Sequence, residues 1–223
     1  MQNFIALMIA GLLATVLVRS FLAHKRRERT VTQVLFSEVR NLLAAPQQIS
    51  GTSLGSQRLD GLYQNHAVQI QTVTDTLATR KLPSLWLMVT VTDKLGVTAK
   101  LDLMMRSAAP TSFSNFDFLK YSLPLPAGFP ELAALRSDKT SGYANLNIIK
   151  NHLGFFMNPR AKELLVTPDG LRLVIQLAEA ERARYVVMRE ANFSDVQIDG
   201  NLVREMIETL LALKVALEEN VLL

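Results

Sequence analysis

An uncharged apolar run near the N-terminus constrains this chain more than any other feature. From residue 4 to 18 every side chain is apolar or small, and after Arg19 and Ser20 the apolar character continues to Ala23. Twenty residues of α-helix cover about 30 Å, the thickness of the hydrocarbon core of a bilayer. We therefore predict a transmembrane anchor over residues 1–23, with Arg19 extended toward the lipid headgroups.

Two other interpretations of this run remain open. A cleaved signal peptide normally carries its positive charges before the apolar run, whereas here the cations follow it. A buried helix of a globular domain is rarely apolar on every face for four turns. The spanning anchor is the interpretation that fits both the length of the apolar run and the basic residues that follow it.

The net charge of +4 is confined to the N-terminal region. Residues 1–30 hold five Lys and Arg residues against one acidic residue, and residues 31–223 hold 19 of each. The basic residues beside the predicted span are Arg19, Lys25, Arg26, Arg27 and Arg29. Such cations stay on the cytoplasmic side of a membrane and attract anionic lipid, so we expect the N-terminus outside and the domain in the cytoplasm. The neutral remainder argues against nucleic-acid binding.

Small residues recur along one side of the predicted span. Ala6, Ala10 and Ala14 are spaced four residues apart. A stripe of small side chains lets a second helix approach closely. It therefore indicates a protein partner in the membrane or a homo-oligomer.

Composition and periodicity predict an α+β domain after the anchor. Hydrophobic residues make up 49% of the chain and Cys is absent, which excludes disulfide scaffolds and thiolate metal sites. Helical spacing over 30–45 ends at Pro46, and 46–57 is rich in Gly, Ser and Gln. We predict a basic juxtamembrane helix and linker over 24–57 and a cytoplasmic α+β domain over 58–223.

Alternating patterns predict an antiparallel sheet with one wet and one dry face. The expected hairpins cover 62–73, 85–104 and 163–177, the last turning at Pro168-Asp169-Gly170. Further expected elements are a strand over 116–122, helices over 131–136 and 143–152, a strand over 184–189 after a stretch over 178–184 that favours helix, and an amphipathic C-terminal helix over 201–219.

Motifs that carry chemistry are missing from the sequence. The segment 51–56 has two glycines but no following Lys, so it is read as linker and not as a phosphate-binding loop. His66 and His152 have no second His at ligand spacing, so neither a metal site nor a cofactor is predicted. The carboxylates worth testing for acid–base roles are Glu179 with Glu181, and Asp117 near Lys120.

One aromatic pair stands out as a possible partner contact. Phe155 and Phe156 lie between Gly154 and Pro159 in what reads as a loop. Large apolar residues that are exposed together usually mark an interaction site. We expect this pair to touch a protein or lipid if the loop is open.

The sequence therefore favours a single-pass membrane protein whose cytoplasmic domain binds other proteins, as an accessory or assembly subunit of a membrane complex. A membrane-tethered enzyme with a carboxylate or hydroxyl site is the first alternative. A domain that senses a small ligand or lipid in an apolar cavity is the second. The substrate or ligand of either alternative stays open.

Overall fold

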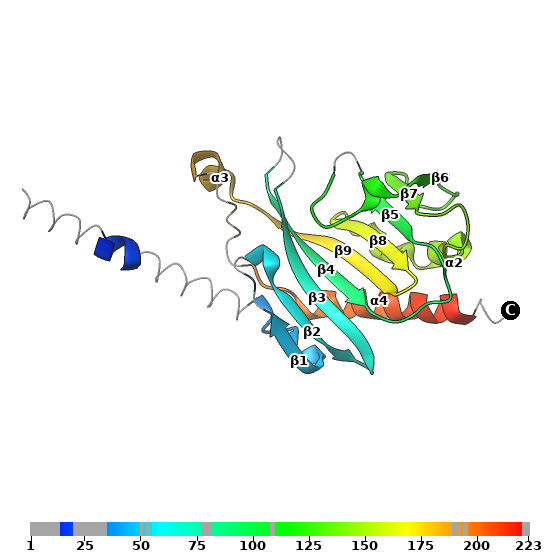
Figure 1. The fold of residues 1–223 in the computed structure, drawn as a ribbon, viewed down its shortest axis with the longest axis horizontal. Helices are drawn as coiled ribbons and strands as arrows, with labels where there is room; N and C mark the ends of the chain where they lie inside the picture. Colours follow the sequence, from blue (N-terminus) through cyan, green and yellow to red (C-terminus); the bar gives the residue numbers. More distant parts are fainter. Residues whose placement is uncertain are drawn as a thin grey trace, which may run out of the picture.

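The fold is α+β, built on one large antiparallel sheet, as the alternating patterns predict (Figure 1). The computed structural model describes residues 14–19, 35–49, 51, 54–76, 82–107, 110–188, 191, 193 and 196–219. The nine strands lie in the order β1-β2-β3-β4-β9-β8-β5-β7-β6, and each neighbouring pair is antiparallel.

The strands are β1 (Ala44–Ile49), β2 (Arg58–Tyr63), β3 (His66–Asp75), β4 (Ser84–Val91), β5 (Leu101–Met105), β6 (Tyr121–Leu123), β7 (Ala133–Ser137), β8 (Ala161–Thr167) and β9 (Gly170–Glu179). The α-helices are α2 (Leu146–Asn151), α3 (Arg182–Met188) and α4 (Gly200–Glu219). Short 3₁₀ turns are η1 (Arg40–Leu42), η2 (Leu54–Ser56), η3 (Phe116–Phe118) and η4 (Leu153–Met157).

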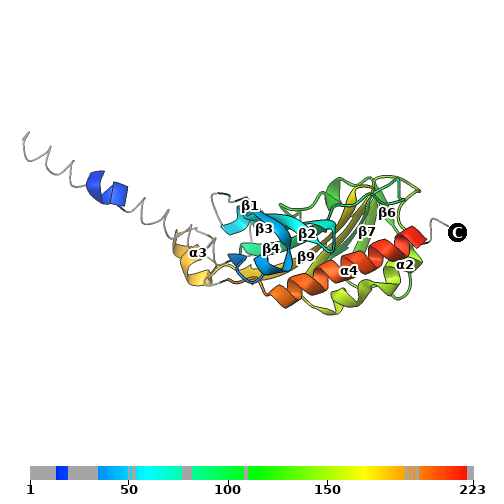
Figure 2. The same cartoon turned by 90° about the horizontal axis from the view of Figure 1, so that it is seen from below.

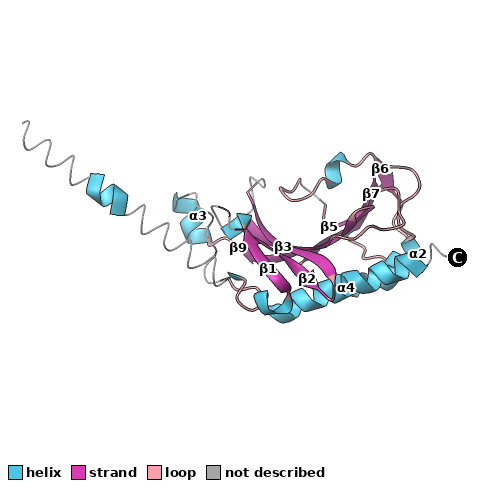
Figure 3. Cartoon of the chain, turned by 60° about the horizontal axis from the view of Figure 1, so that its bottom comes forward, coloured by secondary structure: helices cyan, strands magenta, loops and turns pink. Residues whose placement is uncertain are grey.

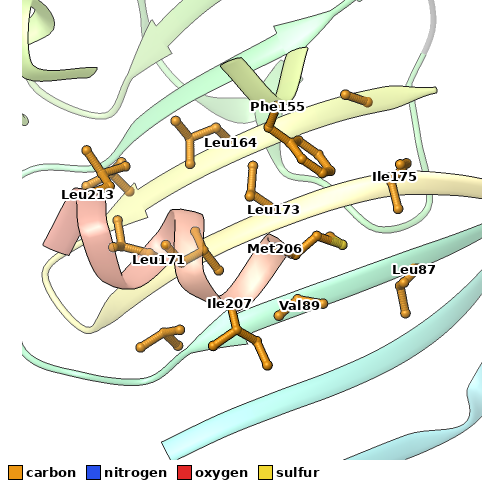
Figure 4. Close-up of a cluster of buried hydrophobic side chains, with 14 of the residues drawn as sticks. Leu87, Val89, Phe155, Leu164, Leu171, Leu173, Ile175, Met206, Ile207 and Leu213 are labelled. Atoms are coloured by element: carbon orange, nitrogen blue, oxygen red, sulfur yellow. The ribbon is translucent and has the colours of Figure 1, made fainter. Parts of the chain in front are cut away.

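Helix α4 covers one face of the sheet, as its amphipathic pattern predicts (Figures 2 and 3). It packs on β4 and β9 and touches α2. Its buried residues are Val203, Met206, Ile207, Leu210, Leu213 and Leu217. Met206 and Ile207 meet Leu173 of β9 and Val89 of β4 in the core (Figure 4). Burying each such side chain contributes about 1.5–3 kcal/mol, so this face holds the helix in place.

The opposite face of the sheet is also partly dry, which corrects the expectation of one wet face. A second apolar cluster there contains Trp86, Met88, Met104, Phe113, Phe116 and Val174. Phe113 and Phe116 come from the segment between β5 and β6, and the ring of Phe113 lies 5.1 Å from that of Trp86. This segment therefore folds back over the sheet.

Two of the three expected hairpins form. The turn between β2 and β3 places Gln64 and Asn65 at φ of 49° and 67°, the conformation of a tight hairpin turn. The turn from β8 to β9 passes through Gly170, at φ 151°. A Cβ at Gly170 would stand 2.2 Å from the carbonyl oxygen of Val91, so only glycine fits there.

The hairpin expected over 85–104 is wrong, because its two strands have other partners. β4 pairs with β3 and β9, whereas β5 pairs with β7 and β8. The loop after β4 turns toward the β8–β9 turn, where the amide of Leu95 donates to the carbonyl of Pro168 at 2.9 Å. Alternation fixes the faces of a strand but not its neighbour.

Other local expectations change under tertiary packing. The helix expected over 131–136 is strand β7, because Leu135 fills the core while its backbone pairs with β5. The strand expected over 116–122 is the turn η3 followed by the short β6. The strand expected over 184–189 is wrong, because Arg182–Met188 form helix α3, and the expected helix over 143–152 is confirmed as α2.

The segment predicted as juxtamembrane helix and linker joins the folded unit instead. Leu35 and Phe36 are 0% and 1% exposed and belong to the main core. Residues 44–49 form the edge strand β1, paired with β2. The packed unit therefore begins by residue 35 and not at 58, because these apolar side chains complete the core beside α4.

Most of the predicted anchor lies outside the described residues. Residues 14–19 are helical, and Val16, Leu17 and Val18 are 53%, 69% and 57% exposed. Ala14 and Arg19 are exposed in the same short stretch. Among the described parts of the chain, no helix combines the length and the apolar character needed to cross a membrane.

Candidate functional site

A groove lies between the β2–β3 turn and the C-terminal half of α4. Its volume is ≈ 490 Å³. The lining residues are Gln64, His66, Leu211, Ala212, Lys214, Val215, Ala216 and Glu219. Val215 is 51% exposed, so an apolar side chain of the helix is open to a binding partner.

Polar side chains form a connected rim around this groove. His66 Nδ1 lies 2.6 Å from Asp93 Oδ2, which ties the start of β3 to the loop after β4. Lys214 Nζ lies 2.8 Å from Glu218 Oε1 and 4.0 Å from Asp93 Oδ2. The rim therefore joins an imidazole, an ammonium group and two carboxylates drawn from three segments of the chain.

Tyr63 extends the rim along α4. Its hydroxyl donates to Glu208 Oε1 at 3.0 Å. Partial burial, and then the hydrogen bond to Glu208, raise the pKa of Tyr63 above its usual value. The hydroxyl thus stays protonated and bonds the hairpin to the helix.

The groove has the character of a binding surface more than of a reaction centre. Its floor is formed by aliphatic side chains of α4, and the rim carboxylates of Asp93 and Glu218 are already paired with His66 and Lys214. Within the described residues, no cluster of three or more His, Cys, Asp or Glu side chains could hold a metal ion. An open groove with an aliphatic floor and a charged rim suits side chains of a second protein.

A second chemically unusual place lies on the opposite face of the sheet, where two acidic side chains are buried together. Asp102 of β5 and Glu163 of β8 are 1% and 0% exposed. The register sets Asp102 opposite Leu165 and Met104 opposite Glu163, so the two carboxyls are diagonal neighbours on one face. Two like charges in a dry site favour keeping one carboxyl protonated.

Among the described residues, only one oxygen of each carboxyl in the pair accepts a hydrogen bond from a neighbouring side chain. Arg172 of β9 donates to Glu163 Oε2, and Ser114 donates to Asp102 Oδ2 at 3.4 Å. Asp102 Oδ1 and Glu163 Oε1 accept no hydrogen bond from any donor in the described part of the chain. Burial, and then the charge of Glu163, raise the pKa of Asp102 well above its usual value. A proton on Asp102 could form a hydrogen bond to Glu163, and both carboxyls would then be hydrogen-bonded.

The sequence-based search missed this pair. Asp102 alternates with Leu101 and Leu103 and so was expected on a wet face. Its burial comes from the segment after β5 that carries Phe113 and Phe116, which was expected to be a loop and a strand and instead folds back over the sheet. The signal that could have found the pair is Asp102 as the one polar residue of β5, together with Glu163 in β8, which also holds Lys162.

The other singled-out polar residues have ordinary structural roles. His152 Nδ1 lies 3.0 Å from the carbonyl oxygen of Ile148 at the end of α2. Glu179 accepts from Gln176 at 3.2 Å on the edge of β9. Lys120 lies over the ring of Tyr121, 5.2 Å from its centre, and the backbone carbonyl of Asp117 accepts from Arg136 at 3.1 Å. None of these carboxylates enters the groove lining.

The expectation that Phe155 and Phe156 are exposed is wrong. They are 5% and 7% exposed in the main core, with their rings edge to face at 6.1 Å. The segment is the 3₁₀ turn η4, which directs both rings inward and leaves the next residue, Met157, 88% exposed. The pair therefore offers no surface to a partner.

The predicted membrane contacts are described only in part. Ala14 and Arg19 fall within the described residues, whereas Ala6, Ala10, Lys25, Arg26, Arg27 and Arg29 lie outside them. Their predicted roles in helix packing and in the membrane interface stay predictions.

Comparison with known proteins adds one distant structural likeness. No family model matches the chain, and no curated protein matches it. Among solved structures, the crystal structure of the mycobacterial trehalose monomycolate transport factor A, TtfA, aligns over 85% of this chain and 95% of that chain. The TM-score is 0.43 and the sequence identity is 11%, and at that level the likeness carries no argument about function.

Proposed function

We propose that this chain is a single-pass membrane protein whose α+β domain lies in the cytoplasm and binds another protein. In this role it is an accessory or assembly subunit of a membrane complex. The proposal joins an N-terminal anchor to the groove beside α4. The anchor is supported by the apolar run over 4–23 and by the basic residues that follow it.

The observation that carries the proposal is the separation between the tethered end of the domain and the groove. The carbonyl of Leu35 accepts from the amide of Ile198 at 3.3 Å, and Glu38 accepts from the amide of Gly200. The first residues of the folded unit therefore lie at the start of α4. The groove lies along the last turns of this 20-residue helix, between Leu211, about 16 Å from Gly200, and Glu219, about 28 Å from it.

This arrangement suits an adaptor that holds a partner away from the bilayer. Helix α4 runs along the sheet, and its last turns lie beside the C-terminus, away from α3 (Figures 1 and 2). A groove next to the tether would favour lipid, whereas a groove at the far end favours a second protein. The stripe of Ala6, Ala10 and Ala14 would allow a further contact inside the membrane.

The groove is tested by a charge introduced at its exposed apolar residue. The full chain is purified from membranes in mild detergent after cross-linking, as wild type and as Val215→Glu. Burying an unpaired carboxylate at a contact costs binding free energy, so we expect about tenfold less of the co-purifying chain. The matched control is Met157→Glu, at a residue that is 88% exposed and outside the groove.

Two results would count against this function. Equal recovery of the same partner with Val215→Glu and Met157→Glu would remove the groove as the binding surface. Recovery of the wild-type chain alone, with no partner and no second copy, would remove the accessory-subunit role itself.

A membrane-tethered enzyme is the second candidate, favoured by the carboxyl pair of Asp102 and Glu163. Strongly perturbed carboxyls cluster at active sites. Here both are almost fully buried beneath the segment that carries Phe113 and Phe116, so a substrate could reach them only after that segment moves. Asp102→Asn would distinguish the two functions, since it removes acid–base chemistry but leaves the groove unchanged.

A further inference from the structure

Helix α3 exposes two adjacent large apolar side chains. Val186 is 62% exposed and Val187 is 79% exposed. Arg182 and Ala183, one turn earlier in the same helix, are exposed as well. Neighbouring apolar side chains left open on a short surface helix mark a contact with something outside the domain.

The position of α3 indicates what that contact is. Ala180, just before α3, packs with Leu85 and Phe193 in a small cluster that Val196 also joins. Two residues beyond Val196, the amide of Ile198 donates to the carbonyl of Leu35. Helix α3 therefore lies at the end of the domain where the N-terminal segment joins, as all three overall views agree (Figures 1, 2 and 3).

The tether to the predicted span is short. Eleven residues lie between Ala23, the end of the apolar run, and Leu35, the start of the packed unit. The twelve residue steps from Ala23 to Leu35 cover about 18 Å as a helix and at most about 40 Å when fully extended. The end of the domain that carries α3 must therefore stay within reach of the headgroups.

The composition of α3 matches a membrane interface. The helix sequence Arg182–Met188 contains two Arg residues and no acidic residue, together with Tyr185 and the two valines. Arg beside aromatic and aliphatic side chains is typical of segments that lie at the boundary of headgroups and acyl chains. Anionic lipid phosphates supply the complementary charge.

We propose that α3 is a second membrane contact, with Val186 and Val187 at the acyl boundary and Arg182 at anionic headgroups. The inference rests on the anchor in the proposed function and is independent of the groove. Two valines bind a bilayer weakly by themselves. The tether raises their effective concentration at the surface to the order of millimolar, which makes a weak contact sufficient.

Single cysteines test this contact cleanly, since the chain contains no Cys. Full-length Val187→Cys carries an environment-sensitive fluorophore and is reconstituted into vesicles that contain lipids with a quencher on the acyl chain. The matched control is Val215→Cys on the last turns of α4, where the side chain is also exposed. The vesicles are phosphatidylcholine alone or with about one third phosphatidylglycerol, the second giving the anionic surface that Arg would bind.

We expect the fluorophore at residue 187 to lose at least about half of its emission in anionic vesicles, while that at 215 stays unchanged. Adding Val186→Asp to Val187→Cys should restore the emission, since a carboxylate opposes insertion. Unquenched emission at 187 in chains that float with the vesicles would overturn the proposal and assign α3 to a protein partner. Equal quenching at 187 and 215 would also overturn it, because the domain would then lie flat on the bilayer and α3 would not be a specific membrane contact.

Flotation separates this inference from the proposed function. Chains that fail to float with vesicles contradict the anchor, and with it both proposals. Chains that float but show no quenching at 187 contradict only the role of α3.

Discussion

Arg172 directs both of its hydrogen bonds to a single oxygen of Glu163, with Nε at 3.1 Å and Nη2 at 2.8 Å from Oε2. The other oxygen, Oε1, is left with its neighbour Asp102, and neither of the facing oxygens has a donor in the described part of the chain. Arg136, opposite Asp102 on β7, donates instead to the carbonyls of Asp117 and Leu119. The domain therefore contains a buried carboxyl pair, and the charge and hydrogen bonding of that pair depend on one proton.

This pair predicts how stability depends on pH. The pKa of Asp102 is raised in the fold above its ordinary value of 3.8, so the folded state holds the proton more tightly than the unfolded state. The stability that this proton provides is fully present below about pH 4 and is lost as pH rises through the folded pKa. Asp102→Asn should remove this loss, since its amide can donate to Glu163 and accept from Ser114.

The measurement is the free energy of unfolding by denaturant from pH 4 to pH 8, for wild type and Asp102→Asn. The free energy of unfolding of the variant should rise relative to wild type as pH rises, by about 1.5–3 kcal/mol at pH 8, the contribution of one buried hydrogen bond to a charged group. Parallel curves for the two proteins would show that Asp102 titrates normally and that the pair is not coupled.

Removing the arginine should expose the cost of a buried charge. Arg172→Met leaves the carboxylate of Glu163, which is 0% exposed, without its cation and should lower the free energy of unfolding by about 3 kcal/mol at neutral pH. Adding Glu163→Gln should recover most of that loss, because the unpaired charge is then gone. If the two substitutions were additive, the pairing of Arg172 with Glu163 would not be the source of the effect.

The β8–β9 turn should tolerate no side chain at its glycine. Gly170→Ala adds a Cβ that meets the carbonyl oxygen of Val91 at a φ that L-residues rarely adopt, so we expect a loss of about 1–3 kcal/mol. Gly154→Ala is the control, since a Cβ there meets no heavy atom within 4 Å, and its change should stay within about 0.5 kcal/mol. Thermal unfolding of both variants makes the comparison, and equal losses would refute the steric explanation.

Local sequence signals predicted the elements that depend on local chemistry. The β8–β9 turn follows from Pro168-Asp169-Gly170, and α4 follows from its apolar stripe. The pairing of β4 with β9 and of β5 with β7 could not be predicted, because alternation determines faces and not neighbours. The burial of Asp102 and of Phe155 depends on segments that arrive from elsewhere in the chain, and β7 is a strand because β5 pairs with it.

The candidate site was less accessible to sequence reasoning than the fold. The groove needs the β2–β3 turn beside the end of α4, two segments separated by most of the chain. His66 and its partner Asp93 are 27 residues apart, and Asp93 falls inside the hairpin wrongly expected over 85–104. The exposure of Val186 and Val187 could not be predicted, because the segment was expected to be a strand. Only the structure shows that it is a helix at the surface.

The account depends most directly on a membrane-held chain whose groove lies in the cytoplasm, and cysteine labelling in cells measures both together. Full-length Met157→Cys, at an exposed residue of the domain outside the groove, is expressed, intact or permeabilised cells are treated with a membrane-impermeant maleimide, and the membranes are then washed with carbonate. The account predicts that the chain stays with the washed membranes and is labelled only after permeabilisation. A chain released by carbonate, or labelled in intact cells, would contradict it.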